Sequence, residues 1–186
     1  MCIRDRIFRE EGKKVIVTTS THLQTPPEEI RAWNIEEVRS LWKSDQIAVI
    51  GTDCESNKNL AAGDQAAVNQ MENKKSVKKM RMPDGSFLQE VLQEAEVVLI
   101  EADGAKHLPC KVPIEKEPVI IPECTDVIAV VGMDALGKPL EEACFRKDLA
   151  VQFLNTSYKH LIAEEDIAKI LSSVQGCLLY TSPSPR

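Results

Sequence analysis

The sequence predicts an α/β fold with a mainly parallel sheet. Short continuous apolar runs followed by polar residues recur along the chain, as is typical of strands buried in a parallel sheet. Helical patterns separate these runs, and that alternation favours parallel strand pairing. The chain has 186 residues, of which 43% are hydrophobic, so it is long enough for a domain-sized core.

The first 51 residues carry two predicted strands. Residues 7–12 have the pattern of the last turns of a helix that ends at Gly12. The apolar run at 15–17 then predicts a buried strand, and residues 46–50 predict the next strand, which ends at Gly51.

Two helix starts are predicted between these strands. The sequence Thr-Pro-Pro-Glu at 25–28 has the pattern of a capping box with proline at the first helical position. Asn34 marks a second start, and its helix would place apolar side chains on one face: Val38, Leu41 and Trp42.

Residues 52–85 have a weak pattern that includes the basic run 74–81. We interpret this run as a solvated surface segment, with phosphate binding as the alternative. A turn at 83–85 then leads to a helix capped by Ser86, with Gln89 completing the capping box. The buried stripe of that helix comprises Phe87, Leu88, Val91, Leu92 and Ala95.

The remaining elements include the two strongest strand predictions in the chain. These are the apolar runs at 96–100 and 126–131. Residues 146–154 and 163–174 have helical periodicity.

Composition excludes several classes of protein. The formal net charge of −6 argues against a nucleic-acid-binding surface, which is usually basic. No apolar run approaches the roughly 18 residues that a membrane span requires. The chain shows no signal peptide, and its cysteines have neither C-x-x-C pairing nor zinc-site spacing, so we expect a cytoplasmic protein with free thiols.

The two ends of the chain do not fit the rest. Residues 1–6 and 177–186 resemble translated sequencing-adapter tails, so we interpret both as non-native and exclude them from fold reasoning. Ordinary disordered termini are the alternative. The native part would then be residues 7–176, which we expect to form one partial α/β domain.

The first candidate site is the hydroxyl-rich end of the first strand. Ligands of doubly wound sheets bind beyond the carboxyl ends of the strands. Residues 18–21 are Thr-Thr-Ser-Thr, followed by His22, and such side chains can bind Mg²⁺, phosphate oxygens or a water. The equally weighted alternative is a Thr-rich strand edge with structural hydrogen bonds.

The second candidate site follows the strand at 96–100. Apolar residues that run into Glu101 and Asp103 resemble a Walker B strand, whose carboxylate binds Mg²⁺ beside nucleotide phosphates. Strand alternation would point both carboxylates the same way. Gly104 would allow the backbone to approach a phosphate. The alternative is an acidic turn.

A third pattern, at 132–139, matches a phosphate loop except at its last position. It has the form G-x-x-x-x-G-K, but Pro139 stands where Mg²⁺ coordination needs Ser or Thr. We therefore interpret it as a strand-end loop, with Asp134 and Lys138 on the substrate side.

Four blocks together resemble one known family. They are V-T-T-S-T-H at 17–22, L-I-E-A-D-G-A-K at 99–106, E-P-V-I-I-P at 117–122 and V-G-M-D-A-L-G-K-P-L at 131–140. They are similar to the YqeC family of selenium-dependent hydroxylase accessory proteins. The resemblance implies a P-loop NTPase-like, three-layer domain and a cytoplasmic role in maturing selenium-dependent molybdenum hydroxylases.

The resemblance also implies roles for individual residues. Glu101 and Asp103 would be catalytic and would bind Mg²⁺, and His22 would lie on the substrate side with Asp134 and Lys138. Mg²⁺ and ATP or GTP would be the cofactors of the full-length protein, bound with the help of Thr19, Thr21, Gly104 and Lys106. The partner would be a selenium-dependent molybdenum hydroxylase or its cofactor, with no nucleic acid and no membrane involved.

The chain departs from the family pattern in three places. The Gly-Lys-Thr phosphate loop and its strand, expected before residue 7, are absent, and so is a late Asn-Lys-x-Asp-like motif expected after Gly176. Phe145-Arg146 stands where we expect His-Arg. A phosphate loop supplies the amides, lysine and hydroxyl that hold a nucleotide, so we expect this chain to bind ATP or GTP negligibly.

These observations lead to one main functional expectation and two alternatives. The first is a fragment of a nucleotide-dependent accessory factor for maturation of selenium-dependent molybdenum hydroxylases, in full length a P-loop NTPase. A non-catalytic chaperone that carries a cofactor or selenium is the second. The third is another P-loop enzyme, such as a metal-insertion GTPase or a cofactor kinase.

Overall fold

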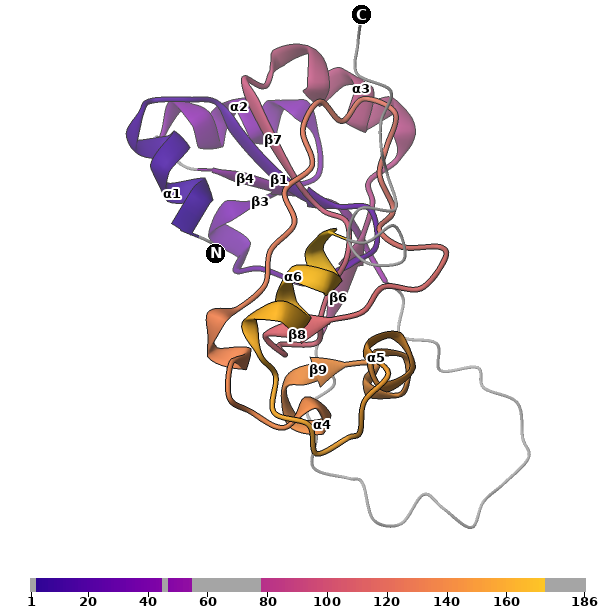
Figure 1. Cartoon of the computed structure of the whole chain (residues 1–186). Coiled ribbons are helices and arrows are strands. Elements are labelled where there is room, and N and C mark those ends of the chain that lie inside the picture. Colours follow the sequence, from indigo (N-terminus) through magenta and orange to yellow (C-terminus); the bar gives the residue numbers. More distant parts are fainter. Residues whose placement is uncertain (1–2, 45–46, 55–77, 173–186) are drawn as a thin grey trace, which may run out of the picture. The chain divides into compact units, whose positions relative to one another are not determined.

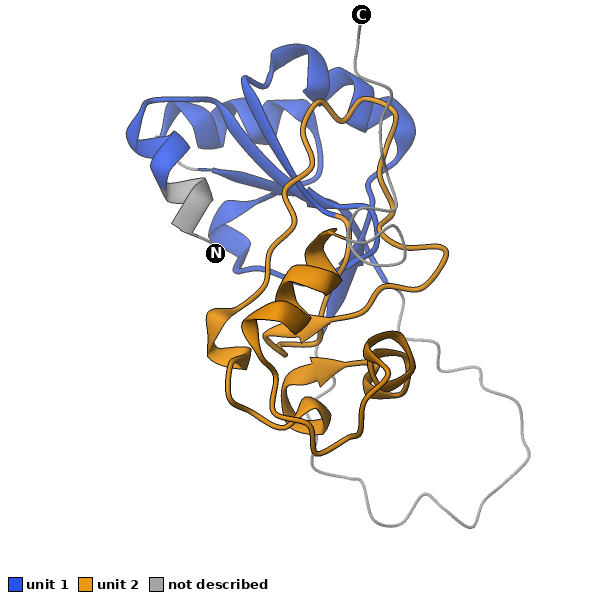
Figure 2. Ribbon diagram, viewed as in Figure 1, with its two compact units in different colours: residues 1–101 blue, residues 102–186 orange. Residues whose placement is uncertain are grey.

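A computed structural model describes residues 3–44, 47–54 and 78–172 of the chain. The chain divides into two compact units, residues 1–101 and 102–186, which Figure 2 shows in different colours. Each unit is described by itself below.

Unit 1 is built on a four-stranded parallel sheet (Figure 1). Its strands are β1 (Val15–Thr19), β3 (Arg31–Ala32), β4 (Ala48–Ile50) and β7 (Val97–Glu101), in the order β3-β4-β1-β7. Every neighbouring pair is parallel. The predicted α/β class with a mainly parallel sheet is therefore confirmed, and so are the strands predicted at 15–17 and 96–100. The strand predicted at 46–50 is confirmed as β4, and its residue 46 lies outside the described residues.

Strands β1 and β7 differ in how deeply they are buried. Strand β1 lies between two neighbours, and Val15, Ile16, Thr18 and Thr19 are all fully buried. Strand β7 is the last strand of the order, and all five of its residues are only half-buried although four are apolar. The two strands pair along their full length, from Val15 opposite Val97 to Thr19 opposite Glu101.

The helices of unit 1 are α1 (Ile3–Glu10), α2 (Ile35–Lys43) and α3 (Gly85–Glu94). Helix α1 contacts β1, whereas α2 lies against β3, β4 and α3 (Figure 1). This arrangement is compatible with a three-layer fold. Helix α1 extends into residues 3–6, which we had interpreted as part of a tail.

Sequence signals locate two of the helix ends correctly. Gly12 follows α1 with a left-handed φ of +72°, a conformation that glycine adopts without strain. Asn34 caps α2 as predicted, because its side chain accepts a hydrogen bond from the amide of Glu37.

Two predicted caps are wrong. Asp84, not Ser86, caps α3: its carboxylate accepts bonds from the amide and the hydroxyl of Ser86, and a carboxylate is the stronger acceptor. The capping box at 25–28 does not form, since only a 3₁₀ turn, η1 (Glu28–Ile30), follows it. The hydroxyl of Thr25 is buried and has no hydrogen-bond partner in the described part of the chain.

A second, antiparallel sheet was not predicted. It contains β2 (His22–Gln24), β5 (Thr52–Asp53) and β6 (Lys79–Arg81) in the order β2-β6-β5. Gly51 permits it, because a Cβ at that position would lie 2.8 Å from the carbonyl oxygen of Arg81. The end of the predicted basic run thus forms β6, while its residues 74–77 lie outside the described residues.

Unit 2 combines short elements around one apolar core. They are β8 (Cys110–Lys111), η3 (Met133–Ala135), α4 (Leu140–Ala143), β9 (Cys144–Phe145), α5 (Lys147–Leu154) and α6 (Glu164–Ser172). Strands β8 and β9 pair in parallel. The core includes Cys110, Leu140, Cys144, Ala150 and Ile170. The predicted helices at 146–154 and 163–174 are confirmed as α5 and α6, and residues 173–174 lie outside the described range.

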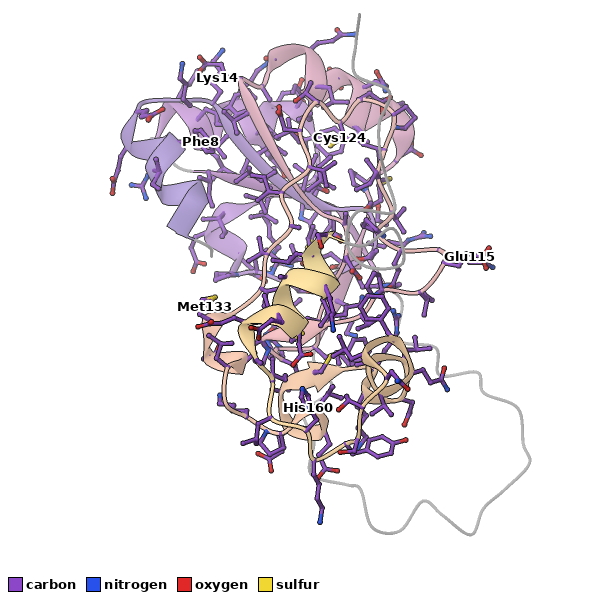
Figure 3. The ribbon with its side chains drawn as sticks, viewed as in Figure 1. Phe8, Lys14, Glu115, Cys124, Met133 and His160 are labelled. Carbon is purple, nitrogen blue, oxygen red and sulfur yellow. The ribbon has the colours of Figure 1, made fainter. Side chains whose placement is uncertain are left out.

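The strand predicted at 126–131 is wrong. No strand forms there, and Val127, Ile128 and Val130 are 54%, 66% and 61% exposed. Met133, just beyond this segment, is 64% exposed (Figure 3). An apolar run becomes a strand only where a neighbouring strand pairs with it, and in the described part of the chain none does.

No helix among the described residues is long and apolar enough to cross a lipid bilayer.

Candidate functional site

The polar ends of β1 and β7 meet at the carboxyl edge of the unit 1 sheet. Thr19 and Glu101 are the last residues of these two parallel strands and lie opposite each other in register. The carboxyl edge is where ligands of such sheets bind. The structure therefore brings the hydroxyl-rich end of β1, the first candidate site, next to Glu101 of the second candidate site.

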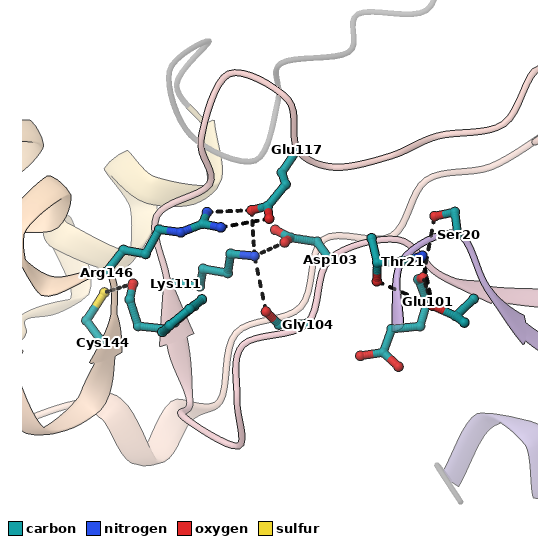
Figure 4. Close-up of polar contacts among 11 residues, drawn as sticks. Ser20, Thr21, Glu101, Asp103, Gly104, Lys111, Glu117, Cys144 and Arg146 are labelled. Atoms are coloured by element: carbon teal, nitrogen blue, oxygen red, sulfur yellow. Dashed lines mark hydrogen bonds and ion pairs between the residues drawn. The ribbon is translucent and has the colours of Figure 1, made fainter. Parts of the chain in front are cut away.

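The hydroxyls at this edge are engaged with the backbone. Thr18 donates to the carbonyl of Ile50 at 2.9 Å, and Thr19 donates to the carbonyl of Glu101 at 3.0 Å. The amide of Ser20 reaches the same carbonyl of Glu101 at 3.1 Å (Figure 4). Thr18 and Thr19 thus hold neighbouring strands together, in agreement with the structural alternative for this run.

Thr21 and His22 extend the edge toward the second sheet. The amide of Thr21 donates to the hydroxyl of Thr19 at 3.0 Å, and the two hydroxyls are 3.3 Å apart. His22 is exposed and begins β2, where it lies opposite Arg81. Its neighbours along the ladder are therefore residues of β6 rather than of β7.

Asp103 lies beyond the strand that suggested its role. Strand β7 ends at Glu101, so strand alternation does not reach Asp103. In unit 2, the ammonium of Lys111 forms an ion pair with Asp103 and donates to the carbonyl of Gly104 at 3.1 Å (Figure 4). The Lys111 side chain is only 7% exposed, so the positive charge is largely removed from water.

Glu117 joins Lys111 to Arg146. One carboxylate oxygen lies 2.7 Å from the Lys111 ammonium, and the guanidinium of Arg146 bonds both oxygens at 2.5 and 2.7 Å. These bonds, from Arg146 first and then Lys111, lower the pKa of Glu117 to about 2 against the opposing effect of burial. We call Asp103, Lys111, Glu117 and Arg146 the ion cluster.

An aromatic ring lies under the cations of this cluster. The ring centroid of Phe145 is 5.5 Å from the Lys111 ammonium and 5.1 Å from the Arg146 guanidinium. Lys106 adds a third cation at 4.8 Å and is itself exposed. Phe145 therefore supports the cations through its electron-rich face.

In unit 2, Lys111 occupies a carboxylate that was predicted to bind Mg²⁺. Carboxylates are the ligands that Mg²⁺ prefers, but Lys111 already neutralises Asp103. Among the described residues, no group of three or more His, Cys, Asp or Glu side chains could hold a metal ion. Within residues 3–44, 47–54 and 78–172, the side chains therefore do not by themselves fit a Mg²⁺ site.

The loop after residue 131 is hydrogen-bonded to Pro109, the residue before β8. The amide of Gly132 donates to the carbonyl of Pro109 at 2.7 Å, and a Cβ at Gly132 would lie 2.8 Å from the Pro109 side chain. Asp134 and Lys138 form an exposed pair 3.4 Å apart. Their contact is a surface interaction between residues four apart in sequence.

The comparisons with known proteins point to one family. A family model described as YqeC protein matches residues 5–148. The chain belongs to the YqeC family. It is also 50% identical over 44 residues to "Uncharacterized protein YqeC" of Escherichia coli (strain K12). That match covers 24% of this chain and 17% of the relative, so the chain spans only part of the relative's length. No solved structure matches the chain.

The YqeC match contains every residue predicted for the site and the whole ion cluster. Sequence reasoning missed Lys111 and assigned no role to Glu117, although Glu117 lies in one of the blocks that carry the resemblance. The sequence does contain two carboxylates and two cations in this region, and such charges must neutralise each other if they are buried together. That requirement is the signal that could have pointed to the ion cluster. Their partners could not be assigned before the fold was known.

Proposed function

We propose that this chain is part of a nucleotide-dependent accessory factor that acts in the maturation of selenium-dependent molybdenum hydroxylases. Its membership of the YqeC family supports the proposal. The observation that carries it is the register of β1 and β7, which places Thr19 opposite Glu101 at the carboxyl edge of a parallel sheet. Walker B acids of P-loop NTPases occupy such a strand end.

Within this proposal, the longer protein has a P-loop NTPase-like fold and binds Mg²⁺ with ATP or GTP. A phosphate loop, which we expect in the longer protein, would supply most of the binding energy for the phosphates. Glu101 would stand beside the bound nucleotide, and the ion cluster would order the segment that follows β7. We place the protein in the cytoplasm.

Nucleotide binding tests this proposal directly. We expect calorimetric titration of the 186-residue chain with Mg²⁺ and ATP or GTP to detect no binding. The longer protein, with its phosphate loop, should bind one of them at micromolar concentration, and Glu101→Gln should abolish hydrolysis or weaken binding at least tenfold. Absence of binding to the longer protein would refute nucleotide dependence.

A second function, a carrier that performs no chemistry, is favoured by the ion cluster. Lys111 pairs with both Asp103 and Glu117, and Arg146 pairs with Glu117, as a purely structural role requires. Hydroxylase activity in cells that express Asp103→Asn in the longer protein separates the two functions. Loss of both hydrolysis and hydroxylase maturation supports the nucleotide-dependent factor, whereas normal maturation supports the carrier.

A further inference from the structure

Two cysteines lie directly opposite each other in the core of unit 2. Cys110 begins β8 and Cys144 begins β9, and the two residues are partners in the register of this parallel pair. Each is 2% exposed. They come from positions 34 residues apart in the sequence and lack C-x-x-C spacing, so only the pairing of β8 with β9 brings them together.

The two thiols also interact. The neighbouring Cys144 thiol and burial raise the pKa of Cys110, whereas the neighbouring Cys110 thiol lowers the pKa of Cys144 against the opposing effect of burial. The backbone amide of Val112 also lowers the pKa of Cys144. Both directions favour Cys144 as the thiol that loses its proton first.

The spacing of the strands suits a covalent bond between them. Paired strands lie about 4.8 Å apart, within the range of roughly 4.4–6.8 Å that separates the Cα atoms of disulfides. Cys54 and Cys124, the other two cysteines in the described residues, are half-buried and free, and neither is a register partner of another cysteine. Cys110 and Cys144 thus differ from Cys54 and Cys124 in two ways: they are register partners in paired strands, and both are buried.

We propose that Cys110 and Cys144 form a redox dithiol that a low-molecular-weight disulfide such as oxidised glutathione converts to a disulfide across β8 and β9. The thiolate of Cys144 attacks one sulfur of oxidised glutathione, forms a mixed disulfide and releases one glutathione thiolate. Cys110 then loses its proton and attacks the Cys144 sulfur, which forms the Cys110–Cys144 bond and expels the second glutathione. Two protein thiols lose two electrons and two protons, and one oxidised glutathione becomes two reduced molecules.

The position of the dithiol gives the bond a structural consequence. Each cysteine directly precedes a residue of this region: Lys111, a member of the ion cluster, follows Cys110, and Phe145, whose ring lies under the cations, follows Cys144. A bond between the two sulfurs would fix the strand pair that carries Lys111, Phe145 and Arg146. Because both thiols are buried, the reaction should require local opening of unit 2 and should be slower than modification of Cys54 or Cys124.

Thiol titration and peptide mapping of the whole chain test this proposal. Trypsin leaves Cys124 and Cys144 in one peptide, 117–146, because Lys138 is followed by Pro139. We would therefore replace Cys2, Cys54, Cys124 and Cys177 by serine, and verify by circular dichroism that this variant folds like the unchanged chain. Incubation with oxidised glutathione should remove both remaining thiols and link peptide 107–111 to peptide 117–146.

Two comparisons make the test decisive. In the same background, Cys144→Ala should leave Cys110 unmodified or as a mixed disulfide, with no linked peptide. The unchanged chain, digested with trypsin and a glutamate-specific protease, should give the same Cys110–Cys144 link without relying on any variant. If both thiols stay reduced at millimolar oxidised glutathione, or if Cys110 or Cys144 pairs with a different cysteine, the proposal is wrong.

Discussion

The two polar regions of the molecule are held together by different forces. At the strand ends of unit 1, the threonine hydroxyls bond neutral backbone carbonyls of neighbouring strands. In the ion cluster of unit 2, charged side chains neutralise one another over an aromatic ring. The first arrangement should be insensitive to pH and salt, whereas the second depends on every charge being present.

Removal of the central cation should have the largest effect. Lys111→Met keeps the apolar stem but leaves Asp103 without its cation and leaves Glu117 paired with Arg146 alone. We expect a loss of about 3 kcal/mol in the free energy of unfolding, measured by urea denaturation. The matched control is Lys138→Met, which removes an exposed pair and should cost less than about 0.5 kcal/mol. Equal effects would show that the cluster is not buried in solution.

Acid should weaken unit 2 in a definite pH range. The pKa of Glu117 is lowered from 4.5 to about 2, so its ionised form stabilises the fold above pH 4.5. That stability is lost as the pH falls from about 5 toward 2, and should amount to about 2 kcal/mol. Urea denaturation at several pH values measures it.

Glu117→Gln supplies the control for this pH dependence. The variant should be less stable at neutral pH and should show a smaller loss between pH 5 and 2 than the unchanged chain. An identical acid profile in both proteins would mean that other carboxylates control the transition.

Loss of one hydroxyl in unit 1 should have a smaller effect. Thr19→Val keeps the shape but removes the donor to the Glu101 carbonyl and the acceptor of the Thr21 amide, at a cost of about 1–2 kcal/mol. The control is Thr21→Val, at a half-buried residue. The cost of Thr19→Val should be the same at low salt and in 1 M NaCl, because neither the hydroxyl nor the backbone groups it bonds carry a charge. A strong salt effect at Thr19 would contradict the proposed difference between the two regions.

The aromatic ring of Phe145 should contribute least to the free energy of unfolding. Phe145→Leu retains an apolar side chain but removes the ring face near three cations, which should cost about 0.5–1 kcal/mol. Trp33→Leu in unit 1 removes a ring that faces a single cation, Arg31, and should cost less. If thermal denaturation ranks the two variants the other way, Phe145 acts as ordinary packing.

Local patterns predicted much of unit 1. The apolar runs of β1, β4 and β7 and the cap at Asn34 can be recognised in sequence because each depends on residues close together in the chain. The same reasoning failed at 126–131, the second strongest strand prediction, where Val127, Ile128 and Val130 are exposed and no strand forms. Apolar character indicates that a segment can be buried, but the partner that buries it is a property of the fold.

The sequence by itself determined the family, the α/β class, and the placement of Thr19 and Glu101 at strand ends, because motifs and periodicity are local. Tertiary structure alone decided that Asp103 pairs with Lys111, that Glu117 binds both Lys111 and Arg146, and that Cys110 lies opposite Cys144. These partners are between 6 and 34 residues apart. Charges and thiols carry no signal of which distant residue will neutralise or contact them, so their pairing follows only once β8 and β9 bring the segments together.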